Sequence, residues 1–169
     1  MTEEFKMAYI FDLDQTLVDS SIAEQYRNQG EWKSVFSMIS QFELYEGIDD
    51  VFRILHEKKE KICVVTSSPE RYCKAVLKKF GLQADATVCY HDTARHKPYP
   101  DPILKAIELL GVSNQYTVSI GDSDKDIIAS QEAGVISGLA LWGRQMGSFS
   151  VNADYVFETV DDLKKFIIT

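Results

Sequence analysis

Long hydrophobic runs, paired cysteines and an excess of positive charge are all missing from this 169-residue sequence. No stretch reaches the roughly 20 apolar residues that span a bilayer, so we expect no membrane-embedded segment. The three cysteines form no CxxC pair, which disfavours a zinc site, and they fit reduced, mostly buried thiols. The acidic start, Met1 to Glu4, and the short apolar run after it disfavour a signal peptide. These absences favour a cytoplasmic globular protein.

The formal net charge of −8 disfavours broad electrostatic binding to nucleic acid or to an anionic membrane. A small anionic substrate stays open, because a metal ion and one or two lysines can reverse the field locally. Apolar residues make up 45% and charged residues 26% of the chain, which is ordinary for a globular protein. The length fits one domain with a core of its own and room for a small insertion.

Apolar, β-rich runs alternate with helical patterns along most of the chain. This alternation predicts a doubly wound parallel sheet of the α/β class, with a Rossmann-like arrangement. The expected strands cover residues 8–11, 61–66, 86–90, 116–120, 137–141 and 154–157. The expected helices cover residues 48–59, 70–80, 101–110, 124–133 and 160–168, and glycines follow three of them.

The stretch from Asp19 to Glu46 lacks this alternation, and its pattern predicts a helical hairpin. Ser20 or Ser21 is expected to cap a first helix, which ends near residues 28–30, and residues 31–42 form a second. We therefore divide the chain into an α/β core, residues 1–18 and 47–169, and a small helical cap insertion, residues 19–46.

Acidic and hydroxyl side chains follow three of the expected strands, at the edge where open α/β sheets bind ligands. These side chains belong to Asp12 and Asp14, to Thr66 and Ser67, and to Asp122 and Asp126, while Lys97 lies in a proline-bounded loop. Two carboxylates ~4 Å apart repel by about 1 kcal/mol in water, and by about 4 kcal/mol at an effective dielectric constant of 20. The Asp12–Asp14 pair therefore indicates a cation, a shared proton or a turn that separates the two groups.

These motifs resemble those of the haloacid dehalogenase-like hydrolase superfamily, and of its phosphatase branch in particular. The resemblance covers nearly the whole chain and rests on four pieces in the family's order: Asp12–Thr16, Thr66, Lys97–Asp101 and Gly121–Asp126. Gln15 departs from the pattern, since many relatives have glycine there. We expect this departure to affect the backbone conformation more than the chemistry.

The resemblance implies a phosphatase that uses Mg²⁺ and hydrolyses small phosphorylated metabolites through an aspartyl-phosphate. Asp12 would attack phosphorus, and Asp14 would protonate the leaving oxygen and then deprotonate water. Thr66, with Ser67 beside it, would bind phosphoryl oxygens, and Lys97 would neutralise charge on Asp12 and the phosphoryl group. The implied Mg²⁺ ligands are Asp12, the backbone carbonyl of Asp14, Asp122 and Asp126, the last of them directly or through water.

In relatives, an insertion after the first strand closes over the site, and here it is short. A short insertion excludes less water and makes fewer specificity contacts, which leaves two alternatives open. Either the substrate range is broad, or a partner subunit of a homo-oligomer completes the pocket. Solvation rather than substrate contact is expected for Arg27, Lys33, Arg95, His96 and Tyr99. Packing of the hairpin is expected for Trp32, Phe36 and Phe42.

Two other functions remain as alternatives. A sugar-phosphate mutase of the same superfamily uses the same aspartyl-phosphate, but it must exclude water, which a short insertion disfavours. A phosphoacceptor receiver domain of signalling proteins also combines an aspartyl-phosphate, a hydroxyl, a Lys-Pro pair and Mg²⁺. Its phosphorylated aspartate follows the third strand, whereas the paired acids here follow the first.

Overall fold

The computed structural model describes residues 5–143 and 151–169, so the acidic residues 1–4 lie outside the described part. Its centre is a parallel sheet with the strand order β5-β4-β1-β6-β7-β8. The sheet strands are β1 (Ala8–Phe11), β4 (Lys61–Val65), β5 (Ala86–Val88), β6 (Thr117–Gly121), β7 (Ile136–Ala140) and β8 (Tyr155–Phe157). The predicted doubly wound sheet is therefore confirmed.

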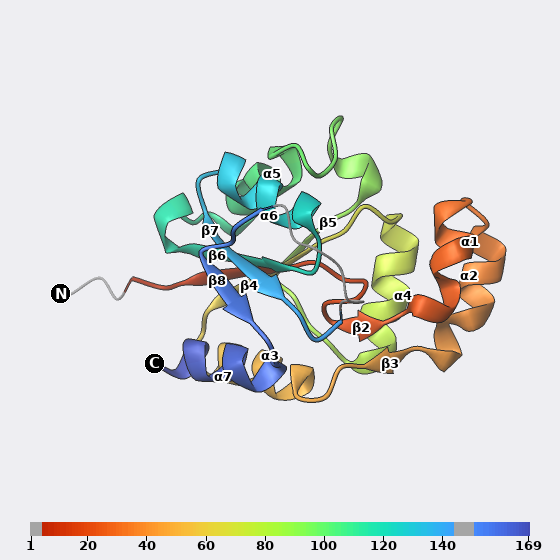
Figure 1. Cartoon of the computed structure of the whole chain (residues 1–169), viewed down its shortest axis with the longest axis horizontal. Coiled ribbons are helices and arrows are strands. Elements are labelled where there is room, and N and C mark those ends of the chain that lie inside the picture. Colours follow the sequence, from red (N-terminus) through yellow and green to blue (C-terminus); the bar gives the residue numbers. More distant parts are fainter. Residues whose placement is uncertain (1–4, 144–150) are drawn as a thin grey trace.

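Helices cover both faces of this sheet, as Figure 1 shows. One face carries α3 (Ile48–Glu57) and α7 (Val160–Ile168), and the opposite face carries α5 (Asp101–Leu110) and α6 (Asp124–Glu132). The helix α4 (Glu70–Phe80) stands beside the sheet, next to the small helices that follow β1. In the described residues, no helix combines the length and the apolar character needed to cross a membrane.

The central strand β1 is buried on both sides. Tyr9 and Phe11 pack into a cluster with residues of α3, α4 and α7, whereas Ala8 and Ile10 pack into a second cluster with residues of α5 and α6. Alternate residues of a strand point to opposite faces, so four consecutive apolar residues are needed for a strand with two covered faces. Because β1 is fixed between β4 and β6, the residues directly after Phe11 are held at the middle of the sheet edge.

The segment after β1 contains two short strands that the sequence analysis does not predict. They are β2 (Val18–Asp19) and β3 (Glu43–Leu44), which pair antiparallel with Val18 opposite Leu44. Between them lie α1 (Glu24–Asn28) and α2 (Trp32–Met38), each shorter than expected because 3-10 turns take up residues 21–23 and 39–41. The helical hairpin is thus present, while its status as a unit separate from the core stays a prediction.

The expectation of buried thiols is confirmed, since Cys63, Cys73 and Cys89 are all buried and form no disulfide. Most predicted strand and helix ends lie within one or two residues of the observed ones. The strand expected at residues 86–90 ends at Val88, because a 3-10 turn starts at Tyr90.

Leucine truncation tests this description of the core. Leu55 in α3 is fully buried, whereas Leu104 in α5 is 44% exposed. We expect Leu55→Ala to lower the free energy of unfolding by about 2–5 kcal/mol, because the substitution leaves a cavity. The same change at Leu104 should lower it by about 0.5 kcal/mol or less. Urea unfolding of both variants measures the difference, and equal losses would contradict the assigned core.

Candidate functional site

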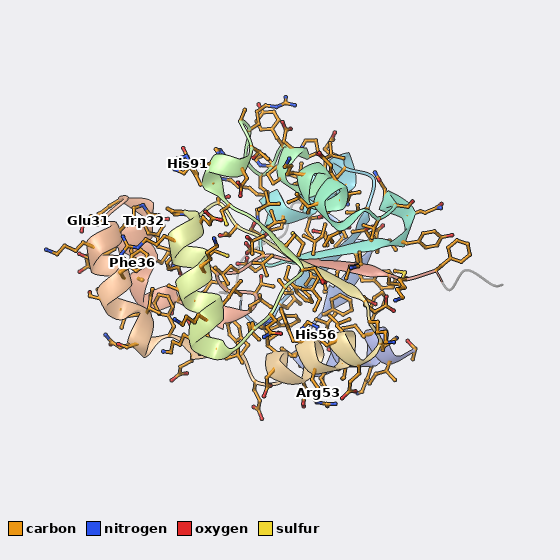
Figure 2. All side chains as sticks on the ribbon, turned by 180° about the vertical axis from the view of Figure 1, so that it is seen from behind. Glu31, Trp32, Phe36, Arg53, His56 and His91 are labelled. Atoms are coloured by element: carbon orange, nitrogen blue, oxygen red, sulfur yellow. The ribbon has the colours of Figure 1, made fainter. Side chains whose placement is uncertain are left out.

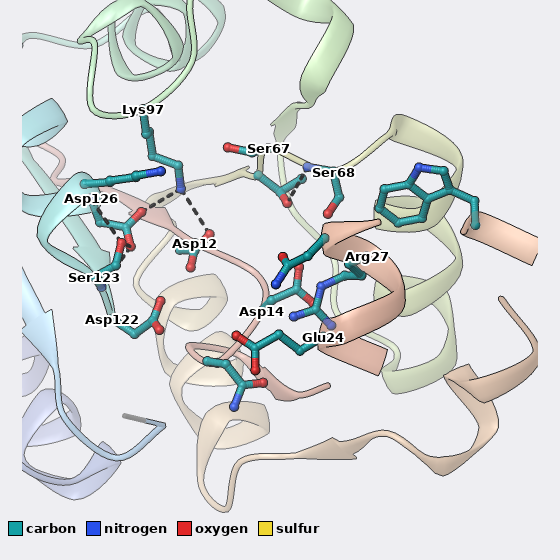
Figure 3. A pocket seen from close by; sticks show the side chains of 15 residues that line it. Asp12, Asp14, Glu24, Arg27, Ser67, Ser68, Lys97, Asp122, Ser123 and Asp126 are labelled. Carbon is teal, nitrogen blue, oxygen red and sulfur yellow. Dashed lines mark hydrogen bonds and ion pairs between the residues drawn. The ribbon is translucent and has the colours of Figure 1, made fainter. Parts of the chain in front are cut away.

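The predicted site residues meet in one cavity at the carboxyl edge of the sheet, shown in Figure 3. Its volume is about 450 Å³. It is lined by all of the predicted site residues, namely Asp12, Asp14, Thr66, Ser67, Lys97, Asp122 and Asp126. The hairpin after β1 adds four more lining side chains: Glu24, Arg27, Asn28 and Trp32. The topology therefore gathers side chains that lie far apart in the sequence.

Lys97 binds two carboxylates at the floor of the cavity. Its Nζ donates to Oδ1 of Asp12 at 3.0 Å, to Oδ1 of Asp126 at 2.6 Å and to the carbonyl of Val65 at 3.3 Å. The side chains are only 7% exposed for Lys97, 14% for Asp12 and 8% for Asp126. Burial lowers the pKa of Lys97, but the two carboxylates outweigh burial and hold this pKa above its ordinary value. Lys97 is therefore a permanent cation beside Asp12.

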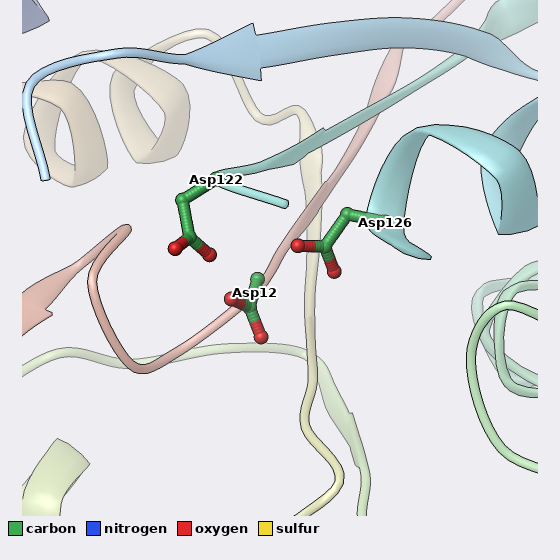
Figure 4. Close-up of side chains that lie close together, drawn as sticks. All are labelled: Asp12, Asp122 and Asp126. Carbon is green, nitrogen blue, oxygen red and sulfur yellow. The ribbon is translucent and has the colours of Figure 1, made fainter. Parts of the chain in front are cut away.

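Three acidic side chains lie close together beside this lysine. Asp12, Asp122 and Asp126 each bring one carboxylate oxygen into a group whose members lie within 4.8 Å of one another, as Figure 4 shows. Burial, with the charge of Asp126, raises the pKa of Asp12 to about 6. Burial, with the charges of Asp12 and Asp126, raises the pKa of Asp122 to about 9. Both carboxyl groups therefore hold a proton more tightly than a free aspartic acid, chiefly because they are buried and also because other acids lie close by.

Asp126 is held in place by the start of α6. Its Oδ2 accepts hydrogen bonds from the backbone N of Ser123 at 3.1 Å and from Oγ of Ser123 at 2.8 Å. Ser123 is the N-cap of α6, and its hydroxyl accepts from the backbone N of Asp126 in return. A Cβ atom at Gly121 would lie 2.3–2.6 Å from the Asp126 side chain, so the end of β6 approaches Asp126 too closely for any other residue.

Asp14 has a set of partners that the sequence analysis misses. Oγ of Ser20 donates to Oδ1 of Asp14 at 2.5 Å. Ser20 occupies the N-cap position of the 3-10 turn at residues 21–23, but its side chain makes no capping hydrogen bond there. The prediction that Arg27 is solvated is wrong, because its side chain is 11% exposed. Its Nη1 lies 3.7 Å from Oδ1 of Asp14 and donates to the carbonyl of Ser20 at 2.8 Å.

Tyr72 in α4 is the third partner of Asp14, and its OH donates to Oδ1 at 2.5 Å. Burial, with the charge of Asp14, raises the pKa of Tyr72, so its hydroxyl stays a donor. Three aromatic rings of the segment after β1 surround the Tyr72 ring, with centroids 5.4 Å away for Trp32 and 6.3 Å for Phe36 and Phe42. Figure 2 shows Trp32 and Phe36 between α2 and α4. The packing role predicted for these aromatic residues is confirmed, and Trp32 also lines the cavity.

The hydroxyl groups after β4 also line the cavity. Thr66 is buried, and its backbone N donates to the carbonyl of Val88 at 2.9 Å, which continues the sheet by one residue. Its Oγ1 accepts from the backbone N of Ser68 at 3.1 Å. That bond uses a lone pair of the hydroxyl and leaves its hydrogen available for a ligand oxygen. Ser67 is exposed and lines the cavity.

The loop after β1 has an unusual backbone at Gln15. Its φ is +61°, in the left-handed region that favours glycine, so the expected effect of this residue on the backbone is present. Its Oε1 accepts from the backbone N of Ser20 at 2.9 Å. A segment after β7 braces this loop, because Nε1 of Trp142 donates to the carbonyl of Thr16 at 2.9 Å. A Cβ atom at Gly143 would lie 2.0 Å from the Gln15 carbonyl oxygen.

Four other residues singled out in the sequence do not line the cavity: Lys33, Arg95, His96 and Tyr99. Lys33, Arg95 and Tyr99 are exposed, as expected, and the guanidinium of Arg95 lies over the Tyr99 ring. His96 is partly buried, because its ring stacks on Tyr90 at 4.3 Å.

Curated relatives resemble this chain over most of its length. It is 33% identical over 126 residues to the pyrophosphatase PpaX of Halalkalibacterium halodurans, an alignment that covers 72% of this chain and 58% of that protein. It is 33% identical over 124 residues to a phosphoglycolate phosphatase of Xanthomonas campestris pv. campestris, covering 70% and 56%. The chain thus spans a little over half the length of these two relatives.

Solved structures agree with the fold. A HAD-superfamily hydrolase of subfamily IA from Geobacter sulfurreducens superposes with a TM-score of 0.76 at 20% identity, covering 95% of this chain and 99% of that one. CbbY from Rhodobacter sphaeroides, solved in complex with phosphate, gives a TM-score of 0.82 at 17% identity, covering 94% and 96%. The family profile described as haloacid dehalogenase-like hydrolase matches residues 22–140, more than half of the sequence. This chain therefore belongs to the haloacid dehalogenase-like hydrolases.

Proposed function

We propose that the protein is an Mg²⁺-dependent phosphatase that hydrolyses small phosphate monoesters through an aspartyl-phosphate on Asp12. The observation that carries this proposal is the buried Lys97, which binds Asp12 at 3.0 Å and Asp126 at 2.6 Å at the floor of the cavity. A lysine in this position holds the attacking carboxylate and attracts a phosphate dianion. The names of the two curated relatives, a pyrophosphatase and a phosphoglycolate phosphatase, support the same chemistry.

Each predicted residue has a role in this reaction. Asp12 attacks phosphorus and carries the phosphoryl group, so one difficult displacement becomes two easier steps. The free hydroxyl hydrogen of Thr66 donates to a phosphoryl oxygen, and Ser67 lies beside it in the lining. Asp14 gives a proton to the leaving oxygen and then takes one from the water that releases phosphate. Lys97 stays charged and offsets the negative charge that gathers on the phosphoryl oxygens.

The cluster of acids fits a magnesium ion. Its donors are all oxygen atoms, and three carboxyl groups face one lysine, which leaves an excess of negative charge. Asp12, Asp122 and the backbone carbonyl of Asp14 would hold the ion. Asp126 would contact it directly or through water. When bound, Mg²⁺ would supply positive charge to the phosphoryl group.

Replacement of the nucleophile tests the reaction. Asp12→Asn keeps the size of the side chain but removes the attacking charge, so we expect phosphate release to fall by at least about 1,000-fold. Asp49→Asn, on the exposed side of α3, is the matched control and should keep normal activity. A malachite-green assay with and without Mg²⁺ measures both variants. Turnover retained by Asp12→Asn would rule out Asp12 as the nucleophile.

The raised pKa values predict how stability depends on pH without a metal ion. Folding raises the pKa of Asp12 from 3.8 to about 6 and that of Asp122 from 3.8 to about 9. Above pH ~4 the folded protein therefore holds protons that the unfolded chain has released. The contribution of these two groups to the free energy of unfolding thus falls as the pH rises toward ~9. We expect Mg²⁺ to raise Tm more at pH 8 than at pH 5, because at pH 5 it must displace protons.

Thermal scans at the two pH values, with EDTA or with Mg²⁺, measure this effect. The control is Asp122→Asn, which should flatten the pH dependence and reduce the Mg²⁺ shift. An Mg²⁺ shift of equal size at both pH values in the unsubstituted protein would contradict the proposed ligand set.

The small hairpin predicts a broad substrate range. It contributes only four lining side chains to the cavity, so few contacts distinguish one leaving group from another. We expect kcat/KM values for sugar phosphates, nucleotides and phosphorylated acids to lie within about 100-fold of one another. A screen for released phosphate, with the molecular mass measured in parallel, checks this. One substrate preferred by several orders of magnitude would instead favour a pocket completed by a partner subunit or a mutase.

A further inference from the structure

Asp14 is held through one of its two carboxylate oxygens. Oδ1 accepts from the hydroxyls of Ser20 and Tyr72, both at 2.5 Å, and lies 3.7 Å from Nη1 of Arg27. In the described part of the chain, every hydrogen bond of this carboxylate goes to Oδ1.

The partners of Oδ1 determine where a proton on Asp14 can sit. A carboxylate oxygen offers about two lone-pair positions, and the two hydroxyl groups take both of them at Oδ1. A carboxylic acid carries its hydrogen on one oxygen only. The transferable proton therefore belongs on Oδ2, and the hydrogen bonds at Oδ1 prevent the carboxyl group from turning over.

The segment after β1 builds most of this arrangement. Arg27 lies in α1, and its Nη1 donates to the carbonyl of Ser20 at 2.8 Å and to Oγ of Ser20 at 2.9 Å. Tyr72 comes from α4, but its ring is packed against Trp32 of α2 at 5.4 Å. The hydroxyl of Ser20 is thus oriented by Arg27, and that of Tyr72 by the rings around it.

We propose that Tyr72, Ser20 and Arg27 are positioning residues that fix Asp14 by Oδ1 and so present Oδ2 as its proton-transferring oxygen. The inference rests on the proposed phosphatase activity. It gives the hairpin a second role, because a segment that lines the cavity also orients the acid that protonates the leaving group. If Asp14 only supplied a hydrogen-bond acceptor for a buried tyrosine, removing the Tyr72 hydroxyl would leave the proton transfer unchanged.

The test compares leaving groups. An alkyl phosphate needs a proton from Asp14 on its leaving oxygen when the P–O bond breaks. The leaving group of p-nitrophenyl phosphate departs as a stable phenolate without a proton. We expect Tyr72→Phe to lower kcat/KM for the alkyl phosphate by about 10- to 100-fold, part of the 10²–10⁴-fold that general acid catalysis contributes. For p-nitrophenyl phosphate the loss should stay below about 3-fold. The quantity kcat/KM covers substrate binding and the steps up to phosphoryl transfer, so later hydrolysis of the aspartyl-phosphate does not affect it.

Matched variants separate positioning from packing. Tyr72→Phe keeps the ring between Trp32, Phe36 and Phe42, and Tyr155→Phe removes an exposed hydroxyl at the sheet edge as the control. Ser20→Ala should show the same selective loss on the alkyl phosphate. Thermal unfolding checks that each variant folds, and Ser20→Ala serves as the main test should Tyr72→Phe not fold.

The possible results are distinct. A selective loss on the alkyl phosphate supports the inference. Equal losses on both substrates, or no loss on either, overturn it while the unsubstituted protein still releases phosphate. An unsubstituted protein that releases phosphate from neither substrate would reject the proposed function, and the inference with it.

Discussion

The ammonium group of Lys97 lies between the carboxylates of Asp12 and Asp126, and the rest of the site is arranged around this contact. Burying acids side by side is costly, and removing one partner of a buried ion pair typically costs about 3–5 kcal/mol. The sheet determines where Asp12 emerges, the start of α6 places Asp126 beside it, and the loop after β5 must therefore bring a cation to that point. Ser123 and Gly121 fix the far side of the contact, since they determine how closely Asp126 approaches.

Much of this arrangement follows from the sequence. Strands such as β1 and β4 are nearly continuous apolar runs between helical patterns, and such runs form buried parallel strands. Because parallel strands end at one edge of a sheet, the positions of Asp12, Thr66 and Asp122 in the sequence were enough to predict that they meet. Because β1 is paired on both sides and covered on both faces, the residues after it are held at the middle of this edge.

The surroundings of Asp14 could not be predicted in the same way. Helical periodicity identifies Tyr72 as a buried position, but it does not say which acceptor its hydroxyl finds. Serine often starts a helix, and arginine usually lies on the solvated surface, so neither residue type points to a contact with Asp14. Only the folded hairpin turns Ser20 and Arg27 inward. The pair of β2 and β3 was missed because two residues are too short to show a strand period.

That two-residue ladder has an architectural consequence. Val18 lies opposite Leu44, so the chain departs from and rejoins the main body at adjacent points. Closing a loop between adjacent points costs only slightly more entropy when the loop is lengthened. A longer or shorter segment between β2 and β3 would therefore leave the register of the six parallel strands unchanged, because both of its ends stay at the same place on the main body.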